Sequence, residues 1–317
     1  MRRALIVGID DYPGAPLAGC VNDAHAIEAL LARNQNGSVN FESKLLTSEQ
    51  GTIDRAVLLG EIERLFADEA DVALLYFAGH GTENDLGGYL VTVDAGRYNE
   101  GVSLSDVLTL ANNSRAHEVV IILDSCHSGH LGQVPAIDNQ RASLREGVSI
   151  LTASRSTQTA TEEAGSGVFT SLVCAALDGG AADVLGKVTV AAVYAYVDES
   201  LGAWQQRPLF KSHVSQLLPL RLAEPQVQIE ILRRLPEWFP DPEQDFRLDP
   251  SYEPEAGEEH ANPEHEEIFG CLQKCARAHL IVPVDQPHMY HAAINSTACR
   301  LTPLGRFYWK LANDGRL

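Results

Sequence analysis

The fold is decided by IILDSCHSG at residues 121–129, an apolar run that ends at a cysteine. A second run, YFAGHG at residues 76–81, ends in the same way at a histidine between two glycines. Short apolar runs that stop at glycine are typical of buried strands in a parallel sheet. Because parallel strands end at a common edge, the two runs predict that His80 and Cys126 lie close together, as in a Cys/His nucleophilic site.

The first 220 residues alternate β-branched runs with helical patterns, which predicts an α/β fold with a mostly parallel sheet flanked by helices. Apolar residues three and four apart indicate helices around 27–31, 57–66 and 169–177, and a further helix is expected to begin near Ser103 after a hairpin at 87–93. Strands are expected at residues 4–9, 41–46, 72–78, 118–123, 148–152 and 212–218.

Three further segments accompany the two runs in a fixed order along the chain: ALIVGI at 4–9, LAGCVNDA at 17–24 and LTAS at 151–154. With this ordered set, residues 4–220 resemble the caspase-like peptidase superfamily, and they are more similar to metacaspases and their bacterial relatives than to animal caspases. The histidine precedes the cysteine by 46 positions, close to the caspase spacing of about 50. Animal caspases carry a QAC(R/Q/G)G pattern where this chain has DSCHSG.

The resemblance implies a cysteine endopeptidase that works through an acyl-enzyme. A free thiol is only slightly ionised at neutral pH, so His80 is expected to take the proton of Cys126 and later deliver it to the leaving amine. The backbone N–H groups of Gly81 and Cys126 are expected to stabilise the oxyanion. Since caspase-like enzymes are described as dyads, we predict no third catalytic residue.

Two acidic residues bear on specificity. In metacaspases, the matching positions line the pocket for the side chain before the cut, and here they are Asp23 and Asp124. A carboxylate about 4 Å from a guanidinium gains about 4 kcal/mol at an effective dielectric of 20, so Arg or Lys should be preferred over Asp. The alternative is that Asp23 caps a helix and Asp124 accepts a hydrogen bond at a strand end, and the two roles could coexist.

The stretch 132–147 has no sustained periodicity and contains Pro135, which predicts a mobile loop. It is either a plain surface connection or, as the resemblance implies, a segment that is cut during activation. Arg141 and Arg145 are then the candidate processing sites.

Composition narrows the class of protein. The chain has 317 residues, a net charge of −19 and six irregularly spaced cysteines, which argues for reduced thiols in the cytoplasm and against binding to nucleic acid or anionic membranes. We see neither a signal peptide nor an apolar run long enough to span a membrane. No cofactor is expected, since no Asp-rich Ca²⁺ loop is present, although some metacaspases need Ca²⁺. Cys271, Cys275 and His279 are spaced as residues of a helix core.

Beyond the peptidase domain, expected at residues 1–221, the composition changes. Residues 222–261 are rich in proline and acidic side chains and are predicted to be a linker. Residues 262–317 are expected to form a winged-helix-like module with a helix at 264–278 and a strand at 280–284. Residues 222–317 contain nine Lys/Arg and sixteen Asp/Glu, so the module should contact a regulatory protein partner and not DNA.

Other functions remain open. The chain could be a catalytically silent caspase-fold adaptor, although it keeps both His80 and Cys126, or an Asp-specific caspase, which the two acidic positions disfavour. A flavodoxin-like nucleotide domain lacks support because no glycine-rich phosphate loop follows the first strand. A role in bacterial defence or cell death is an analogy with the family alone.

Overall fold

The computed structural model describes residues 1–127, 144–153, 162–163, 166–201 and 208–317. The described chain divides into two compact units. The first, which we call the N-terminal unit, contains residues 1–182 and 187–224, and the second, the C-terminal unit, contains residues 183–186 and 225–317.

The N-terminal unit is built on a sheet whose main path runs β11-β7-β6-β3-β1-β2. Neighbouring strands on this path are parallel except β11, which runs antiparallel to β7. This confirms the predicted α/β fold with a mostly parallel sheet. The strands of the path are β1 (Arg2–Gly8), β2 (Glu42–Thr47), β3 (Val72–Asn84), β6 (Glu118–His127), β7 (Val148–Thr152) and β11 (Leu209–His213).

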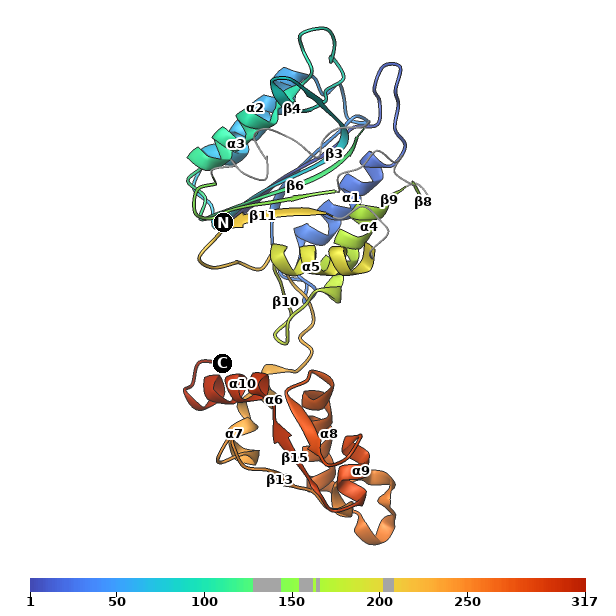
Figure 1. Cartoon of the computed structure of the whole chain (residues 1–317), viewed down its shortest axis with the longest axis vertical. Helices are drawn as coiled ribbons and strands as arrows, with labels where there is room; N and C mark the ends of the chain where they lie inside the picture. The colour runs from blue at the N-terminus through green and yellow to red at the C-terminus, as the bar shows by residue number, and fades with distance from the viewer. Residues whose placement is uncertain (128–143, 154–161, 164–165, 202–207) are drawn as a thin grey trace. The chain divides into compact units, whose positions relative to one another are not determined.

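Helices cover both faces of this sheet, which is why its central strands are apolar throughout. Leu5 and Val7 of β1 pack on the side of α2 and α3, whereas Ala4 and Ile6 pack on the side of α1, α4 and α5 (Figure 1). The helices are α1 (Cys20–Ala32), α2 (Arg55–Ala67), α3 (Leu104–Asn113), α4 (Val168–Ala175), a π-helical turn (Ala176–Gly180) and α5 (Val190–Leu201).

Short strands complete the unit. A hairpin follows β3, so that β4 pairs with the end of β3, and β5 pairs with β4. Two small antiparallel pairs, β8 with β9 and β10 with β12, lie outside the main sheet. These strands are β4 (Gly87–Leu90), β5 (Val102–Ser103), β8 (Glu162–Glu163), β9 (Ser166–Gly167), β10 (Lys187–Val188) and β12 (Arg221–Leu222).

One predicted strand is displaced. Residues 212–218 were expected to be extended, but β11 ends at His213. The reason is its antiparallel register with β7, in which Leu209 pairs with Thr152 and His213 with Val148. Since β7 begins at Val148, residues after His213 have no strand beside them.

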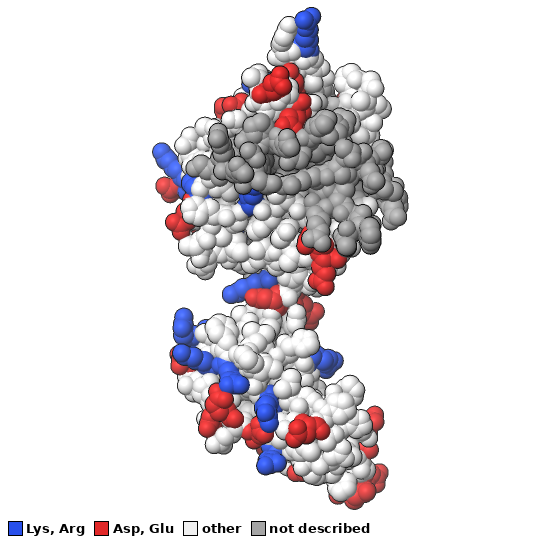
Figure 2. All heavy atoms as spheres, viewed as in Figure 1, with Lys and Arg blue, Asp and Glu red and all other residues white. Residues whose placement is uncertain are grey.

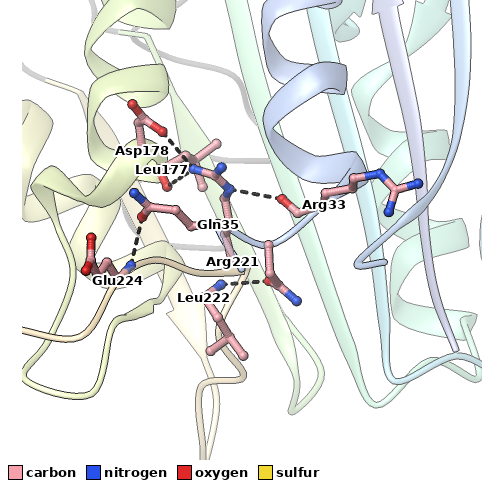
Figure 3. A network of polar contacts seen from close by, with 8 residues as sticks. Arg33, Gln35, Leu177, Asp178, Arg221, Leu222 and Glu224 are labelled. Carbon is pink, nitrogen blue, oxygen red and sulfur yellow. Dashed lines mark hydrogen bonds and ion pairs between the residues drawn. The ribbon is translucent and has the colours of Figure 1, made fainter. Parts of the chain in front are cut away.

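A buried arginine anchors the last residues of the N-terminal unit (Figure 3). The Arg221 guanidinium donates to the backbone carbonyls of Arg33 at 3.1 Å and Leu177 at 3.0 Å, and to the Asp178 carboxylate at 3.0 Å. Gln35 adds a side-chain bond to the N–H of Glu224 at 2.7 Å. These bonds fix residues 221–224 against the end of α1 and the π-helical turn.

The C-terminal unit consists of short elements around an apolar core and a three-stranded antiparallel sheet in the order β13-β15-β14. The expected helix at 264–278 and strand at 280–284 correspond to α8 and β14. Among the described residues, no helix is long and apolar enough to cross a bilayer. The elements are α6 (Ile229–Arg233), α7 (Leu235–Trp238), β13 (Phe246–Arg247), 3-10 turns (Pro250–Tyr252, Pro254–Ala256, Glu258–His260), α8 (Pro263–Arg277), β14 (Ile281–Val284), α9 (Met289–Ile294), β15 (Ala298–Leu301) and α10 (Pro303–Asn313).

The stretch 222–261, expected to be a linker, is instead ordered, and residues 225–261 are part of the C-terminal unit. Three of its six prolines, Pro236, Pro250 and Pro254, stand in the first turn of α7 and of two 3-10 turns, where the missing N–H costs nothing. Between them, the chain supplies buried apolar side chains to the core: Leu232, Leu235, Trp238, Phe239, Leu248 and Tyr252. The winged-helix resemblance of residues 262–317 stays a prediction.

Candidate active site

The β3–β6 pairing sets the geometry of the predicted reactive edge. In this register, His80 pairs with Cys126 and Gly81 with His127, while Ala78 pairs with Asp124. Residues 80 and 126 are therefore neighbours on adjacent parallel strands at the carboxyl end of the sheet. The side chains of Cys126 and His127 lie outside the described part of the structure.

The His80 ring is oriented by a backbone carbonyl. Its Nε2 lies 2.8 Å from the carbonyl oxygen of Ala15. A carbonyl only accepts hydrogen bonds, so Nε2 carries the proton of the neutral ring and Nδ1 is the nitrogen that can accept one. Sequence reasoning missed this partner, because a carbonyl has no side-chain signature.

Tyr12 fixes the backbone and the ring of His80 together. Its hydroxyl accepts the N–H of His80 at 3.1 Å and donates to the carbonyl of Val91 at 3.2 Å, and the two rings lie 4.6 Å apart between centroids. Burial raises the pKa of Tyr12 well above its usual value, so the hydroxyl keeps its proton. A Cβ at Gly79 would lie 2.4 Å from the Tyr12 hydroxyl, so a larger residue there would displace the tyrosine from these contacts.

The predicted pair of acidic residues comes together around Gly167. Asp23 lies in the first turn of α1 and accepts the N–H of Gly167 at 3.0 Å through Oδ2 and 3.3 Å through Oδ1. A Cβ on Gly167 would lie 2.9 Å from Oδ2 of Asp124 and 3.1 Å from Oδ2 of Asp23. The two carboxylates thus face one glycine, although the residues are 101 positions apart in the chain.

The alternative roles were a helix cap for Asp23 and a strand-end hydrogen-bond acceptor for Asp124, and the structure shows only the second. Asp23 does not cap α1, because the cap residue is Gly19 and the first N–H groups of the helix, those of Cys20 and Val21, bond to Asp10. Asp124 does accept a hydrogen bond at its strand end, from the Thr170 hydroxyl at 2.6 Å. Asp23 is therefore left without the capping role, whereas Asp124 has the alternative role and can still line a pocket.

Burial dominates the electrostatics around the two carboxylates. Desolvation raises the pKa of Asp124, and hydrogen bonds from the side chain and backbone of Thr170 oppose that rise. Burial, with smaller contributions from Asp23 and Asp178, raises the pKa of the Cys174 thiol to about 12. Cys174 is therefore a thiol and not a thiolate at neutral pH.

Comparison with known proteins assigns the sequence to a family. The protein-family model of the caspase domain matches residues 1–218. The chain belongs to the caspase domain family. Its N-terminal unit therefore contains a caspase-family cysteine peptidase domain, and the substrates of such a domain are proteins.

A solved structure agrees with this fold. The crystal structure of protein GSU0716 from Geobacter sulfurreducens has a TM-score of 0.52 and 17% sequence identity, and the match covers 71% of this chain and all of that one. At this identity the likeness shows the fold alone. No curated protein matches the chain.

Of the two candidate processing sites in the caspase domain, only Arg145 belongs to the described residues. Arg141 and most of the stretch 132–147 lie outside the described residues. The Arg145 guanidinium donates to the carbonyls of Ala116 at 2.7 Å, Glu146 at 2.6 Å and Ala111 at 3.4 Å. In this fold Arg145 holds the start of β7, and it would have to leave these bonds to enter a protease pocket.

The described part of the caspase domain also contains a cleft that His80 does not line. A cleft of about 660 Å³ lies at the other end of the sheet and is lined by residues that include Asp71, His117 and Gln216. Among the residues that the structure describes, no three His, Cys, Asp or Glu side chains come together as metal ligands.

Proposed function

We propose that this caspase-family chain is a cysteine endopeptidase that cleaves proteins after Arg or Lys through an acyl-enzyme intermediate. The observation that carries the proposal is the strand register that makes Cys126 the neighbour of His80. The two carboxylates that meet at Gly167 support the preference for a basic side chain.

In the proposed reaction, Nδ1 of His80 takes the thiol proton of Cys126, while Nε2 remains bonded to Ala15. The thiolate sulfur bonds to the carbonyl carbon of the scissile peptide, and the C–N bond then breaks as the imidazolium gives its proton to the leaving amine. Water, deprotonated by the same imidazole, attacks the thioester and releases the new carboxyl end. The N–H groups of Gly81 and Cys126 are the proposed donors to both oxyanions.

The substrate side chain before the cut would meet Asp23 and Asp124. A guanidinium offers paired N–H donors that match a carboxylate, and the attraction is large because both carboxylates are buried. An aspartate in the same place would be repelled by a similar energy. This is the reason to prefer an Arg/Lys peptidase over the Asp-specific alternative.

The C-terminal unit is proposed to regulate the peptidase through a protein partner. Figure 2 shows its Lys and Arg side chains interspersed with Asp and Glu on the face in view, without one continuous basic surface. A gel-shift assay with random duplex DNA at physiological salt should detect no binding. Salt-sensitive binding that is lost on mutation of the unit's arginines would contradict the proposal.

Processing at Arg141, a cytoplasmic location and a role in bacterial defence complete the proposal, the last by analogy with the family. Mass spectrometry of active protein tests the processing step, because cleavage should place a new carboxyl end at Arg141. Active protein with the segment always intact would argue that cleavage is not needed.

The decisive test of the peptidase itself is labelling with thiol-reactive peptides. The full chain is treated with two matched peptides that end in Arg or in Asp, and the modified residue is located by mass spectrometry. We expect the Arg peptide to label Cys126, and the label to be lost in Cys126→Ala. Cys271→Ala, which removes a thiol of the C-terminal unit, is the control that should label normally. No labelling would favour the silent adaptor, and preference for the Asp peptide would favour an Asp-specific caspase.

A further inference from the structure

A line of three buried side chains ends at one of the two carboxylates. Tyr76 of β3 lies with its hydroxyl 2.6 Å from Oγ1 of Thr170, which is in the first turn of α4. Thr170 Oγ1 in turn lies 2.6 Å from Oδ2 of Asp124, at the carboxyl end of β6. Tyr76 is fully buried, and Thr170 is 1% exposed. These residues come from three different elements, and no reaction step described above uses Tyr76 or Thr170.

The direction of these two hydrogen bonds follows from counting protons. A threonine hydroxyl has one proton, and Thr170 donates it to Asp124. The Tyr76 hydroxyl must then be the donor in its bond to Thr170. Burial, together with Asp124 and Asp23, raises the pKa of Tyr76 far above its usual value, so this donor is kept at every working pH. Both hydroxyl protons therefore point toward Asp124, an order that suits an ionised carboxylate.

The charges around Asp124 make such donors necessary. Asp23 of α1 faces the same glycine, and the thiol of Cys174 on α4 is close enough to Asp23 to respond to its charge. Burial alone would favour a protonated Asp124, and the bonds from Thr170 oppose this. Asp23 has a different donor, the N–H of Gly167 at the cap of α4. The start of α4 thus supplies donors to both carboxylates, and for Asp124 these donors include the Thr170 hydroxyl beside the backbone of the same residue.

We infer that Thr170 and Tyr76 are positioning residues for substrate specificity, because they hold Asp124 as an ionised acceptor for the basic side chain of the substrate. The inference rests on the proposed function and adds two residues that contact no substrate. It also gives a specific role to the buried Tyr76 hydroxyl, which an apolar core would otherwise have no reason to contain.

The test is the pH dependence of kcat/KM with an Arg peptide, measured for the wild type, Thr170→Val, Thr170→Ser and Tyr76→Phe. Without the hydroxyl of Thr170, the pKa of Asp124 rises, so the acidic limb of the Thr170→Val profile should move up by about one pH unit or more. Below the midpoint of the wild-type limb, a shift of one unit means about a tenfold loss of kcat/KM, and this loss disappears as the pH rises above the limb of the variant. Thr170→Ser should restore the wild-type profile, and Tyr76→Phe should shift it less.

Two controls separate this effect from damage to the fold or to the nucleophile. Ser149→Ala removes another buried hydroxyl bond of the same sheet, the one to Ser212 at 2.8 Å, and should leave the profile unchanged. The rate at which a small neutral reagent alkylates Cys126, followed by mass spectrometry across the same pH range, should be the same in Thr170→Val and wild type.

The outcomes are distinct. If the wild type does not cut the Arg peptide, the proposed function fails, whatever the variants do. If the wild type cuts it and Thr170→Val keeps the wild-type acidic limb, the positioning role is overturned. A shift that appears equally in the alkylation profile also overturns it, because the change then lies in the nucleophile. If Thr170→Val does not fold, Tyr76→Phe/Thr170→Val carries the same test, since it leaves no buried hydroxyl unpartnered.

Discussion

The two units of the chain are built in different ways. In the N-terminal unit, strands of five to thirteen residues on the main sheet carry long apolar runs, and the important residues stand where those runs stop. In the C-terminal unit, most elements have six residues or fewer, and its core comes from side chains spread from Val184 to Tyr308. Local pattern therefore specifies the first unit, whereas packing between distant segments specifies the second.

The largest effect should come from the edge of the sheet in the N-terminal unit. Cys126→Ala and His80→Ala are each expected to lower kcat/KM on an Arg peptide by about a thousandfold or more, because nucleophile and base act as one unit. Circular dichroism should show an unchanged fold. Substantial activity in folded Cys126→Ala would remove this residue as the nucleophile.

The second largest effect is expected from Phe239→Ala, which tests whether residues before 262 belong to the core of the C-terminal unit. Phe239 is 1% exposed, and its carbonyl accepts the Trp309 indole N–H at 2.7 Å. Phe239→Ala should cost about 3–5 kcal/mol of unfolding free energy. Amide hydrogen exchange should rise throughout the C-terminal unit and stay unchanged in the sheet of the N-terminal unit.

The matched control for that experiment is Phe307→Ala. Phe307 is 55% exposed, so its loss should change stability by less than about 0.5 kcal/mol. If both substitutions had equally small effects, residues 225–261 would behave as the linker that composition suggested, and the contrast between the two units would disappear.

Particular residues show why prediction succeeded in one place and failed in another. The strands that carry His80 and Cys126 were predictable because an apolar run and its terminal glycine are neighbours in sequence. The order of His80 before Cys126 agreed with the family, and the parallel sheet places the carboxyl ends of the two strands side by side. Pro250 and Pro254 were misread because composition cannot tell a proline that begins a turn from one that prevents structure.

The candidate site shows the same limit. Asp23 and Asp124 could be proposed from their positions within family motifs. Their shared contact with Gly167 could not, because it depends on how α4 docks against the sheet. Ala15 contributes only a carbonyl, and Thr170 looks like any residue in a helix. Partners that act through the backbone, or through packing of distant elements, leave no pattern to find.

A smaller effect than the first two concerns the choice of substrate. Peptides with Arg or Lys before the scissile bond should be cut at least about a hundredfold better than Asp equivalents, which is about 2.7 kcal/mol. Asp124→Asn, which keeps the shape but removes the charge, should reduce this ratio about tenfold. The measurement is kcat/KM for matched peptides, and a library that returned Asp as the preferred residue would overturn the pocket assignment.

The smallest effect should come from Tyr12, whose part in the site was visible only in the structure. Tyr12→Phe keeps the ring against His80 but removes the acceptor for the His80 N–H and the donor to Val91. The net loss of about 1 kcal/mol predicts a kcat about fivefold lower with little change in KM, since the substrate pocket is untouched. Because Tyr12 keeps its proton at working pH, the ratio of variant to wild type should be flat between pH 6 and 9. Tyr98→Phe, at a residue that is 84% exposed, is the control that should change nothing. An unaltered kcat in Tyr12→Phe would mean that the glycines and the Ala15 carbonyl orient His80 without help from the Tyr12 hydroxyl. The geometry of the site in the N-terminal unit would then depend on local sequence pattern even more than the structure indicates.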